Sequence, residues 1–120
     1  MKLALIGTGK IIADALVALQ PIDAIERQAI FARPHSRAKG AALAAQYGIA
    51  AVYTDYAALL AQADIDTVYI GLVNSAHVSD GKQALEAGKN VIMEKPFTGT
   101  LAEARELVAL AREKNLYIFE

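Results

Sequence analysis

Short apolar runs alternate with stretches of helical periodicity along the whole chain, and this alternation constrains the fold more than any other feature. The first run, residues 3–6, is Leu-Ala-Leu-Ile without a polar break, as expected of a strand covered on both faces. Ile12, Leu16 and Leu19 then repeat at helical spacing. Because each parallel connection needs a covering helix, the alternation predicts an α/β fold, a three-layer doubly wound parallel sheet with helices on both faces.

About six strands and five intervening helices can be assigned. The predicted strands are residues 3–6, 29–32, 51–53, 67–72, 90–93 and 117–119. Residues suited to cap a helix precede four of the expected helices: Ser36, Asp55, Asn74 or Ser75, and Thr100. Thr100 and Glu103 have the spacing of a capping box. The helix that they open carries an apolar stripe formed by Leu101, Ala104, Val108 and Ala111.

Composition excludes several classes of protein. Twelve basic and thirteen acidic residues give a net charge of −1, so no basic excess is available to bind nucleic acid or an anionic membrane. The chain has no Cys, which excludes disulfides, thiolate catalysis and Cys-based metal sites and suits a reducing compartment. No apolar run exceeds six residues, and the first strand begins two residues after Met1. We therefore expect no metal site, no membrane span and no signal peptide, and a cytoplasmic protein.

The 120 residues suffice for one domain. The chain stops in or just after the last predicted strand, whereas a domain more often finishes with a covering helix or tail. We therefore expect residues 1–120 to be an N-terminal domain excised from a longer protein. The open edge formed by residues 117–119 is expected to pair with another chain or to self-associate weakly.

Ligands of open α/β sheets bind beyond the carboxyl ends of the strands, and the first such segment is Gly7-Thr8-Gly9. Gly7 allows a tight turn, Gly9 lets the backbone approach a pyrophosphate, and the following helix presents its N–H groups to the anion. The third position of the Gly-x-Gly-x-x-Gly/Ala fingerprint is Ile12, which we expect to open the contact between helix and strand slightly. A purely structural turn is the alternative, but the place of the motif in a βαβ unit favours dinucleotide binding.

The end of the second strand indicates which dinucleotide is preferred. An NAD site usually has an acidic residue there, whereas this chain has Ala32 followed by Arg33, and no acidic residue stands between Glu26 and Asp55. Arg33 and Arg37 could hold a 2′-phosphate by charge-assisted hydrogen bonds. The sequence therefore predicts NADP as the preferred cofactor, with NAD as the alternative. The cations could instead only solvate the start of a helix.

Two further segments follow the fourth and fifth strands. Asn74 can cap a helix and offer its amide to a ligand, whereas His77 suits a structural role as well as a functional one. Lys95 stands between Glu94 and Pro96, where it could orient a substrate hydroxyl or move its proton, or could be ordinary surface charge. A cis peptide bond before Pro96 would aim the lysine side chain.

Taken together, these segments resemble the N-terminal domain of the Gfo/Idh/MocA family of oxidoreductases. The motifs are Gly-Thr-Gly-Lys-Ile at 7–11, Asn-x-x-His at 74–77, Ala-Gly-Lys-Asn-Val at 87–91 and Glu-Lys-Pro at 94–96. The resemblance implies a Rossmann domain that holds NAD(P), followed by a second domain that carries much of the substrate site. It also implies hydride transfer between the nicotinamide and a hydroxyl or carbonyl carbon, often of a sugar or cyclitol, in a parent that is a homo-oligomer.

The resemblance assigns Lys95 as the catalytic residue that contacts the reacting hydroxyl, and Glu94 as a neighbour of the nicotinamide ribose. The family commonly has Pro where this chain has Val73, so we expect a looser loop there. The residues expected at the cofactor are Gly7, Thr8, Gly9, Lys10, Ile11, Ala32, Arg33, Arg37, Leu72, Val73, Asn74, His77 and Glu94.

Other functions remain open at this point. The family's remaining catalytic groups belong to the second domain, so the 120-residue chain is expected to bind cofactor without turning over substrate. A non-catalytic module that senses dinucleotide or docks a protein is the alternative, although it would not need Lys95. A different nucleotide ligand is disfavoured because no Gly-Lys-Ser/Thr of a Walker-type loop follows the glycines.

Overall fold

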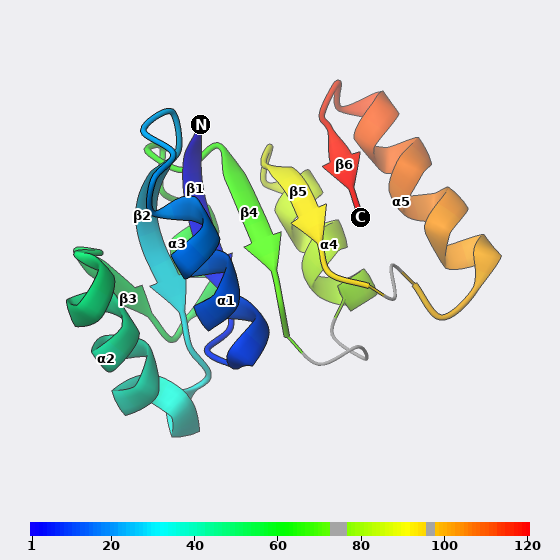
Figure 1. Cartoon of the computed structure of the whole chain (residues 1–120). Helices are drawn as coiled ribbons and strands as arrows, with labels where there is room; N and C mark the ends of the chain where they lie inside the picture. The colour runs from blue at the N-terminus through cyan, green and yellow to red at the C-terminus, as the bar shows by residue number, and fades with distance from the viewer. Residues whose placement is uncertain (73–76, 96–97) are drawn as a thin grey trace.

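Six parallel strands form one sheet in the computed structural model, which describes residues 1–72, 77–95 and 98–120. The strands are β1 (Lys2–Ile6), β2 (Glu26–Phe31), β3 (Ala51–Tyr53), β4 (Thr67–Ile70), β5 (Asn90–Met93) and β6 (Ile118–Phe119). Their order across the sheet is β3-β2-β1-β4-β5-β6, so the chain winds outward from β1 to one edge and then from β4 to the other (Figure 1). This is the strand order of the Rossmann fold, and it confirms the predicted doubly wound sheet.

The helices lie on both faces of the sheet, as predicted. α1 (Lys10–Leu19) and α2 (Arg37–Tyr47), the latter preceded by the 3₁₀ turn Pro34–Ser36, pack on one face. α3 (Tyr56–Leu60), α4 (His77–Glu86) and α5 (Leu101–Glu113) pack on the other. Figure 1 shows α1 in front of β1 and α4 behind β5.

The continuous apolar run of β1 supplies both cores, because successive side chains of a strand point to opposite faces. Leu5 packs with Ile12 and Leu16 beneath α1. Ala4 and Ile6 pack on the other face, in the larger cluster that receives the apolar residues of α3, α4 and α5. All five of these side chains are fully buried.

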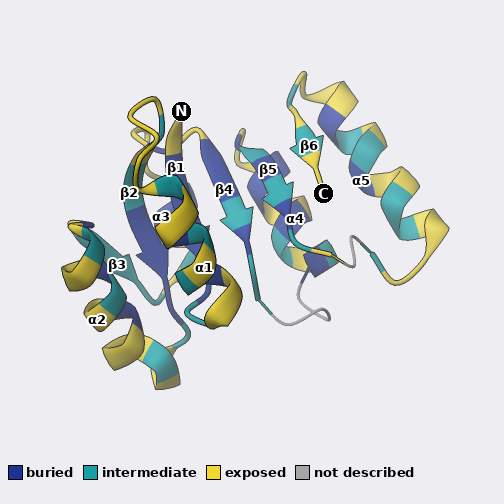
Figure 2. Ribbon diagram, viewed as in Figure 1, coloured by how far each residue is buried: buried dark blue, intermediate teal, exposed yellow. Residues whose placement is uncertain are grey.

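One half of the sheet lacks a cover on the face that carries α1 and α2. Tyr69 of β4 and Ile92 of β5 are half-buried there, and no described helix lies in front of β5 or β6 (Figure 2). Tyr117 and Phe119, at the β6 edge, are 69% and 58% exposed and stack with their ring centroids 6.1 Å apart. Edge pairing and self-association through these residues stay a prediction.

Two of the predicted caps form hydrogen bonds. Thr100 Oγ1 accepts from the main-chain N–H of Glu103 at 3.1 Å, and Asp55 Oδ1 accepts from that of Ala58 at 3.2 Å. Ser36 occupies the N-cap position of α2 without a side-chain capping bond. The alternative caps before α4, residues 74 and 75, lie outside the described residues.

The apolar stripe assigned to α5 is partly wrong. The helix buries Leu107 and Ala111, whereas Leu101 is 66% exposed. Leu107 and Ala111 are four residues apart and lie in the core cluster, and Leu110 packs against it, so this neighbouring stripe is the one that faces the sheet. Several strand boundaries also differ from the predicted ones. β1 begins at Lys2, β2 runs from Glu26 to Phe31, β4 ends at Ile70 and β6 begins at Ile118. Among the described residues, no helix is long and apolar enough to cross a membrane.

Candidate functional site

The turn between β1 and α1 has the geometry predicted from its two glycines. Gly7 has φ +127°, a conformation that side chains rarely permit, and a Cβ there would come within 3.0 Å of the Gly71 carbonyl oxygen. Gly9 is the N-cap of α1, and no heavy atom beyond those of its two chain neighbours lies within 4 Å of the position that its Cβ would take. The space beyond the start of α1 is therefore open.

Ile12 packs closely against β4 instead of loosening the contact between helix and strand. Its side chain is fully buried. A Cβ on Gly71, the residue after β4, would lie 2.7 Å from Ile12 Cδ1. The absence of a side chain at Gly71 thus makes room for the bulk of Ile12.

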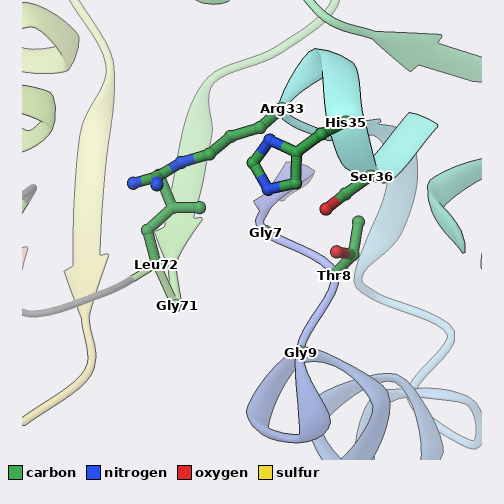
Figure 3. Close-up of a pocket in the computed structure, with 8 residues that line it drawn as sticks. All are labelled: Gly7, Thr8, Gly9, Arg33, His35, Ser36, Gly71 and Leu72. Atoms are coloured by element: carbon green, nitrogen blue, oxygen red, sulfur yellow. The ribbon is translucent and has the colours of Figure 1, made fainter.

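A cleft of about 190 Å³ opens at the carboxyl ends of β1, β2 and β4 (Figure 3). It lies where the strand order reverses, which is the usual ligand position of this type of sheet. It is lined by Gly7, Thr8, Gly9, Arg33, His35, Ser36, Gly71 and Leu72.

The cleft suits the pyrophosphate of a dinucleotide. The first N–H groups of a helix have no acceptors within the helix, and the helix dipole adds positive charge at that end. The first turn of α1 contains no acidic residue that would oppose an anion. The open space at Gly9 allows close approach of a ligand to the backbone.

Arg33 is the cation that the structure brings into this cleft. It is half-buried, and its side chain extends toward Leu72 on the opposite wall (Figure 3). The pKa of Asp80, in α4, is raised because the carboxyl group is partly buried. The positive charge of Arg33 and, to a smaller extent, His77 lower this pKa and so offset part of the rise. Arg37 is exposed at the start of α2 and does not line the cleft.

Three other residues predicted near the pyrophosphate and adenosine are Lys10, Ile11 and Ala32. Lys10 and Ile11 are exposed in the first turn of α1, and Lys10 Nζ pairs with Asp14 Oδ2 at 2.9 Å. Ala32 is fully buried, and its N–H donates to the Tyr53 carbonyl at 2.8 Å. Their roles at the cofactor stay predictions.

His77 is 1% exposed, and its Nε2 lies 3.1 Å from the Leu72 carbonyl oxygen. This contact joins the start of α4 to the wall of the cleft, which favours a supporting role. Val73 and Asn74, also predicted at the cofactor, lie outside the described residues.

A second cavity, of about 350 Å³, opens at the ends of β4 and β5. It is lined by Tyr69, Ile92, Met93, Glu94, Lys95 and Glu120. The Tyr69 hydroxyl donates a hydrogen bond to Glu94 Oε1. Lys95 is exposed and forms none of the ion pairs found among the described residues. The conformation of the peptide bond before Pro96 lies outside the described part of the chain.

Sequence reasoning missed His35, Ser36 and Gly71 as residues lining the first cleft. His35 and Ser36 fall between the two arginines in the segment that follows β2, so their position was a usable signal. Ser36 was assigned to helix capping, but its side chain makes no capping bond. Gly71 was placed inside a strand, whereas β4 ends one residue before it.

Comparison with known proteins agrees with this geometry. Residues 1–120 match the Gfo/Idh/MocA family, described as an oxidoreductase family with an NAD-binding Rossmann fold. A trans-1,2-dihydrobenzene-1,2-diol dehydrogenase from Xenopus laevis is 33% identical over 119 residues, which are 99% of this chain and 36% of that protein. The D-xylose 1-dehydrogenase (NADP(+)) of Hypocrea jecorina is 45% identical over 71 residues, 59% of this chain and 18% of that enzyme.

Among solved structures, KijD10, a 3-ketoreductase from Actinomadura kijaniata in complex with TDP-benzene and NADP, superposes with a TM-score of 0.90 at 33% identity. The match covers 97% of this chain and 35% of that one. The chain thus spans about a third of the length of the Xenopus laevis dehydrogenase and of KijD10. With the family match, the strand order and the cleft at the start of α1 in agreement, the chain belongs to the Gfo/Idh/MocA oxidoreductase family and forms its NAD(P)-binding Rossmann domain.

Proposed function

We propose that the chain is the coenzyme domain of an NADP(H)-preferring oxidoreductase whose second domain carries the substrate. The proposed reaction is reversible hydride transfer at a hydroxyl or carbonyl carbon of a sugar, cyclitol or related polyol. The family match and the names of the relatives, which include a D-xylose dehydrogenase, support this substrate class. The second domain is proposed because the chain covers only 36% of its full-length relative from Xenopus laevis.

The observation that carries the proposal is the cleft at the start of α1, which combines an open glycine turn with one cation. Residues 7–9 would hold the pyrophosphate through main-chain N–H groups. Arg33, with His35 and Ser36 on the same side of the cleft, would bind the adenosine 2′-phosphate. No carboxylate occurs between Glu26 and Asp55 to repel that group.

When bound, the nicotinamide donates or accepts the hydride. Lys95 would hold the reacting hydroxyl and move its proton at Nζ, and Glu94 would accept a hydrogen bond from the nicotinamide ribose. Lys95 lines a cavity on the β4–β5 side of the sheet, which favours an enzyme over a non-catalytic dinucleotide sensor. Without a second domain to exclude water and hold substrate, the 120-residue chain should bind cofactor but not turn over substrate.

Cytoplasmic location and a homo-oligomeric parent are part of the proposal. The lack of Cys suits a reducing compartment, which supports the cytoplasm. Assembly of the parent is carried over from the family resemblance alone.

The test is a parallel titration of the chain with NADPH and NADH, followed by nicotinamide fluorescence. The chain contains no Trp, so its own emission interferes little. We expect NADPH to bind at least about 10-fold more tightly, because a charge-assisted contact to the 2′-phosphate contributes about 1.5–3 kcal/mol. Arg33→Ala should remove this preference while leaving NADH binding nearly unchanged. Equal or tighter binding of NADH by the unaltered chain would overturn the preference, and no binding of either would contradict the proposed function.

A further inference from the structure

The hydrogen bond between Tyr69 and Glu94 follows from the register of two neighbouring strands. Tyr69 of β4 stands opposite Ile92 of β5. Because side chains alternate between faces, Glu94 lies on the same face as Ile92 and therefore as Tyr69. The Glu94 N–H donates to the Ile70 carbonyl at 3.0 Å, which continues the pairing of the two strands as far as Glu94. The Tyr69 hydroxyl can then reach the Glu94 carboxylate, and it donates to Oε1.

Tyr69 is suited to act as a fixed donor. Its ring packs against the core cluster beneath α1, which contains Leu5 and Ile12. Burial, and then the contact with Glu94, raises the pKa of Tyr69 well above its ordinary value. The hydroxyl therefore stays protonated, and a donor, at alkaline as well as neutral pH. A hydrogen bond to an ionised carboxylate is stronger than a neutral one, so the pair resists rotation of the Glu94 side chain.

The pair lies on the side of the sheet where the second half of a dinucleotide is expected. In this fold a dinucleotide crosses the carboxyl ends of the strands at the reversal of strand order, here between β1 and β4. The adenosine half belongs with Arg33, beyond β2. The nicotinamide half therefore belongs beyond β4, next to the cavity that Tyr69, Glu94 and Lys95 line.

We propose that Tyr69 is a positioning residue for cofactor binding, whose hydroxyl fixes one oxygen of the Glu94 carboxylate so that the other accepts a hydrogen bond from a hydroxyl of the nicotinamide ribose. This inference rests on the proposed function. Without the phenol, the carboxylate can turn to solvent or toward the ammonium of Lys95, the next residue. The ribose then meets an acceptor that has to be ordered during binding, which lowers affinity.

The experiment compares two probes, NADPH and adenosine 2′,5′-bisphosphate, which lacks the nicotinamide ribose. Binding of both to the chain and to Tyr69→Phe is measured by calorimetry. We expect Tyr69→Phe to weaken NADPH binding by about 5-fold, which lies within the net contribution of one ordinary hydrogen bond, because Tyr69 orients the acceptor without itself contacting the ribose. Binding of the bisphosphate should be unchanged, and this second probe also reports that the variant is folded. Tyr117→Phe is the matched control, since it removes an exposed hydroxyl from the same open face and should change neither affinity.

A double-mutant cycle tests whether Tyr69 acts through Glu94. Glu94→Ala should weaken NADPH binding, and adding Tyr69→Phe to it should cause no further loss. The inference is overturned if Tyr69→Phe leaves NADPH affinity unchanged, if it weakens both probes equally, or if the two losses add. Failure of the proposed function looks different, because the unaltered chain would then bind neither probe, and the inference would fall with it.

Discussion

Replacement of Gly71 by Ala tests how the fold accommodates Ile12 in place of the usual small residue. A Cβ on Gly71 would lie 2.7 Å from Cδ1 and 3.1 Å from Cγ1 of Ile12, both closer than van der Waals contact. Ile12 is fully buried, so its side chain has little room to move away. Overpacking of this kind costs about 1–3 kcal/mol, and the lower entropy of Ala in the unfolded chain returns about 0.4–1 kcal/mol. We expect a net loss of about 1.5 kcal/mol for Gly71→Ala.

Ile12→Val removes the methyl group that the new Cβ would meet. Alone it should cost about 1 kcal/mol through lost burial. In the double variant the clash is relieved, so the combined loss should be about 1 kcal/mol smaller than the sum of the single losses. Urea denaturation followed by far-ultraviolet circular dichroism measures all four free energies of unfolding. A Gly71→Ala variant as stable as the parent chain, or strictly additive losses, would refute this account of the packing.

Four other predictions concern stability and assembly. Lys89→Met should cost about 3 kcal/mol in urea denaturation, because the buried Nζ donates to two main-chain carbonyls just beyond α3 at 2.8 and 2.6 Å. Lys82→Met, at an exposed position, should cost much less, and equal losses would contradict this prediction. Thr100→Ala should lower the free energy of unfolding by about 1 kcal/mol, because it removes the side-chain cap of α5. Thr100→Ser keeps the capping hydroxyl and should therefore keep most of that stability. The pKa of Asp80 is raised on folding, so the folded state holds this proton to higher pH and stability falls as pH rises between the unfolded and folded pKa values. Asp80→Asn should remove this contribution to the pH dependence of stability, which is measured as the urea midpoint at a series of pH values. The same pH profile in the variant and the parent chain would contradict the prediction. Phe119→Glu should suppress any concentration-dependent association seen by sedimentation, and association that persists would show that β6 is not the contact.

The parts of the fold encoded by local pattern could be predicted from the sequence. The uninterrupted apolar run of β1 indicated a strand buried on both faces, and Ala4 and Leu5 pack into opposite cores. The spacing of Thr100 and Glu103 predicted a cap that forms. Each of these signals lies within a few residues, so no knowledge of the tertiary structure was needed.

Features set by contacts between distant residues could not be predicted. The choice between two apolar stripes on α5 depends on how that helix docks on the sheet, which the pattern of Leu and Ala leaves open. The complementarity of Ile12 and Gly71 joins residues that are far apart in the sequence. The Tyr69–Glu94 pair likewise requires the register of β4 and β5, and nothing in the sequence marks Tyr69 as more than an apolar strand residue.

The central claim is that a dinucleotide binds in the cleft at the start of α1, and amide chemical-shift mapping with NADPH tests it most directly. At 12.8 kDa the chain suits two-dimensional NMR of a ¹⁵N-labelled sample. We predict that the largest shifts fall on Thr8, Gly9 and Arg33, with little change at Gly48 or Lys89, far from the cleft. Saturating NADPH that leaves the Thr8 and Gly9 amides unshifted, or that shifts Lys89 and its neighbours instead, would contradict the account.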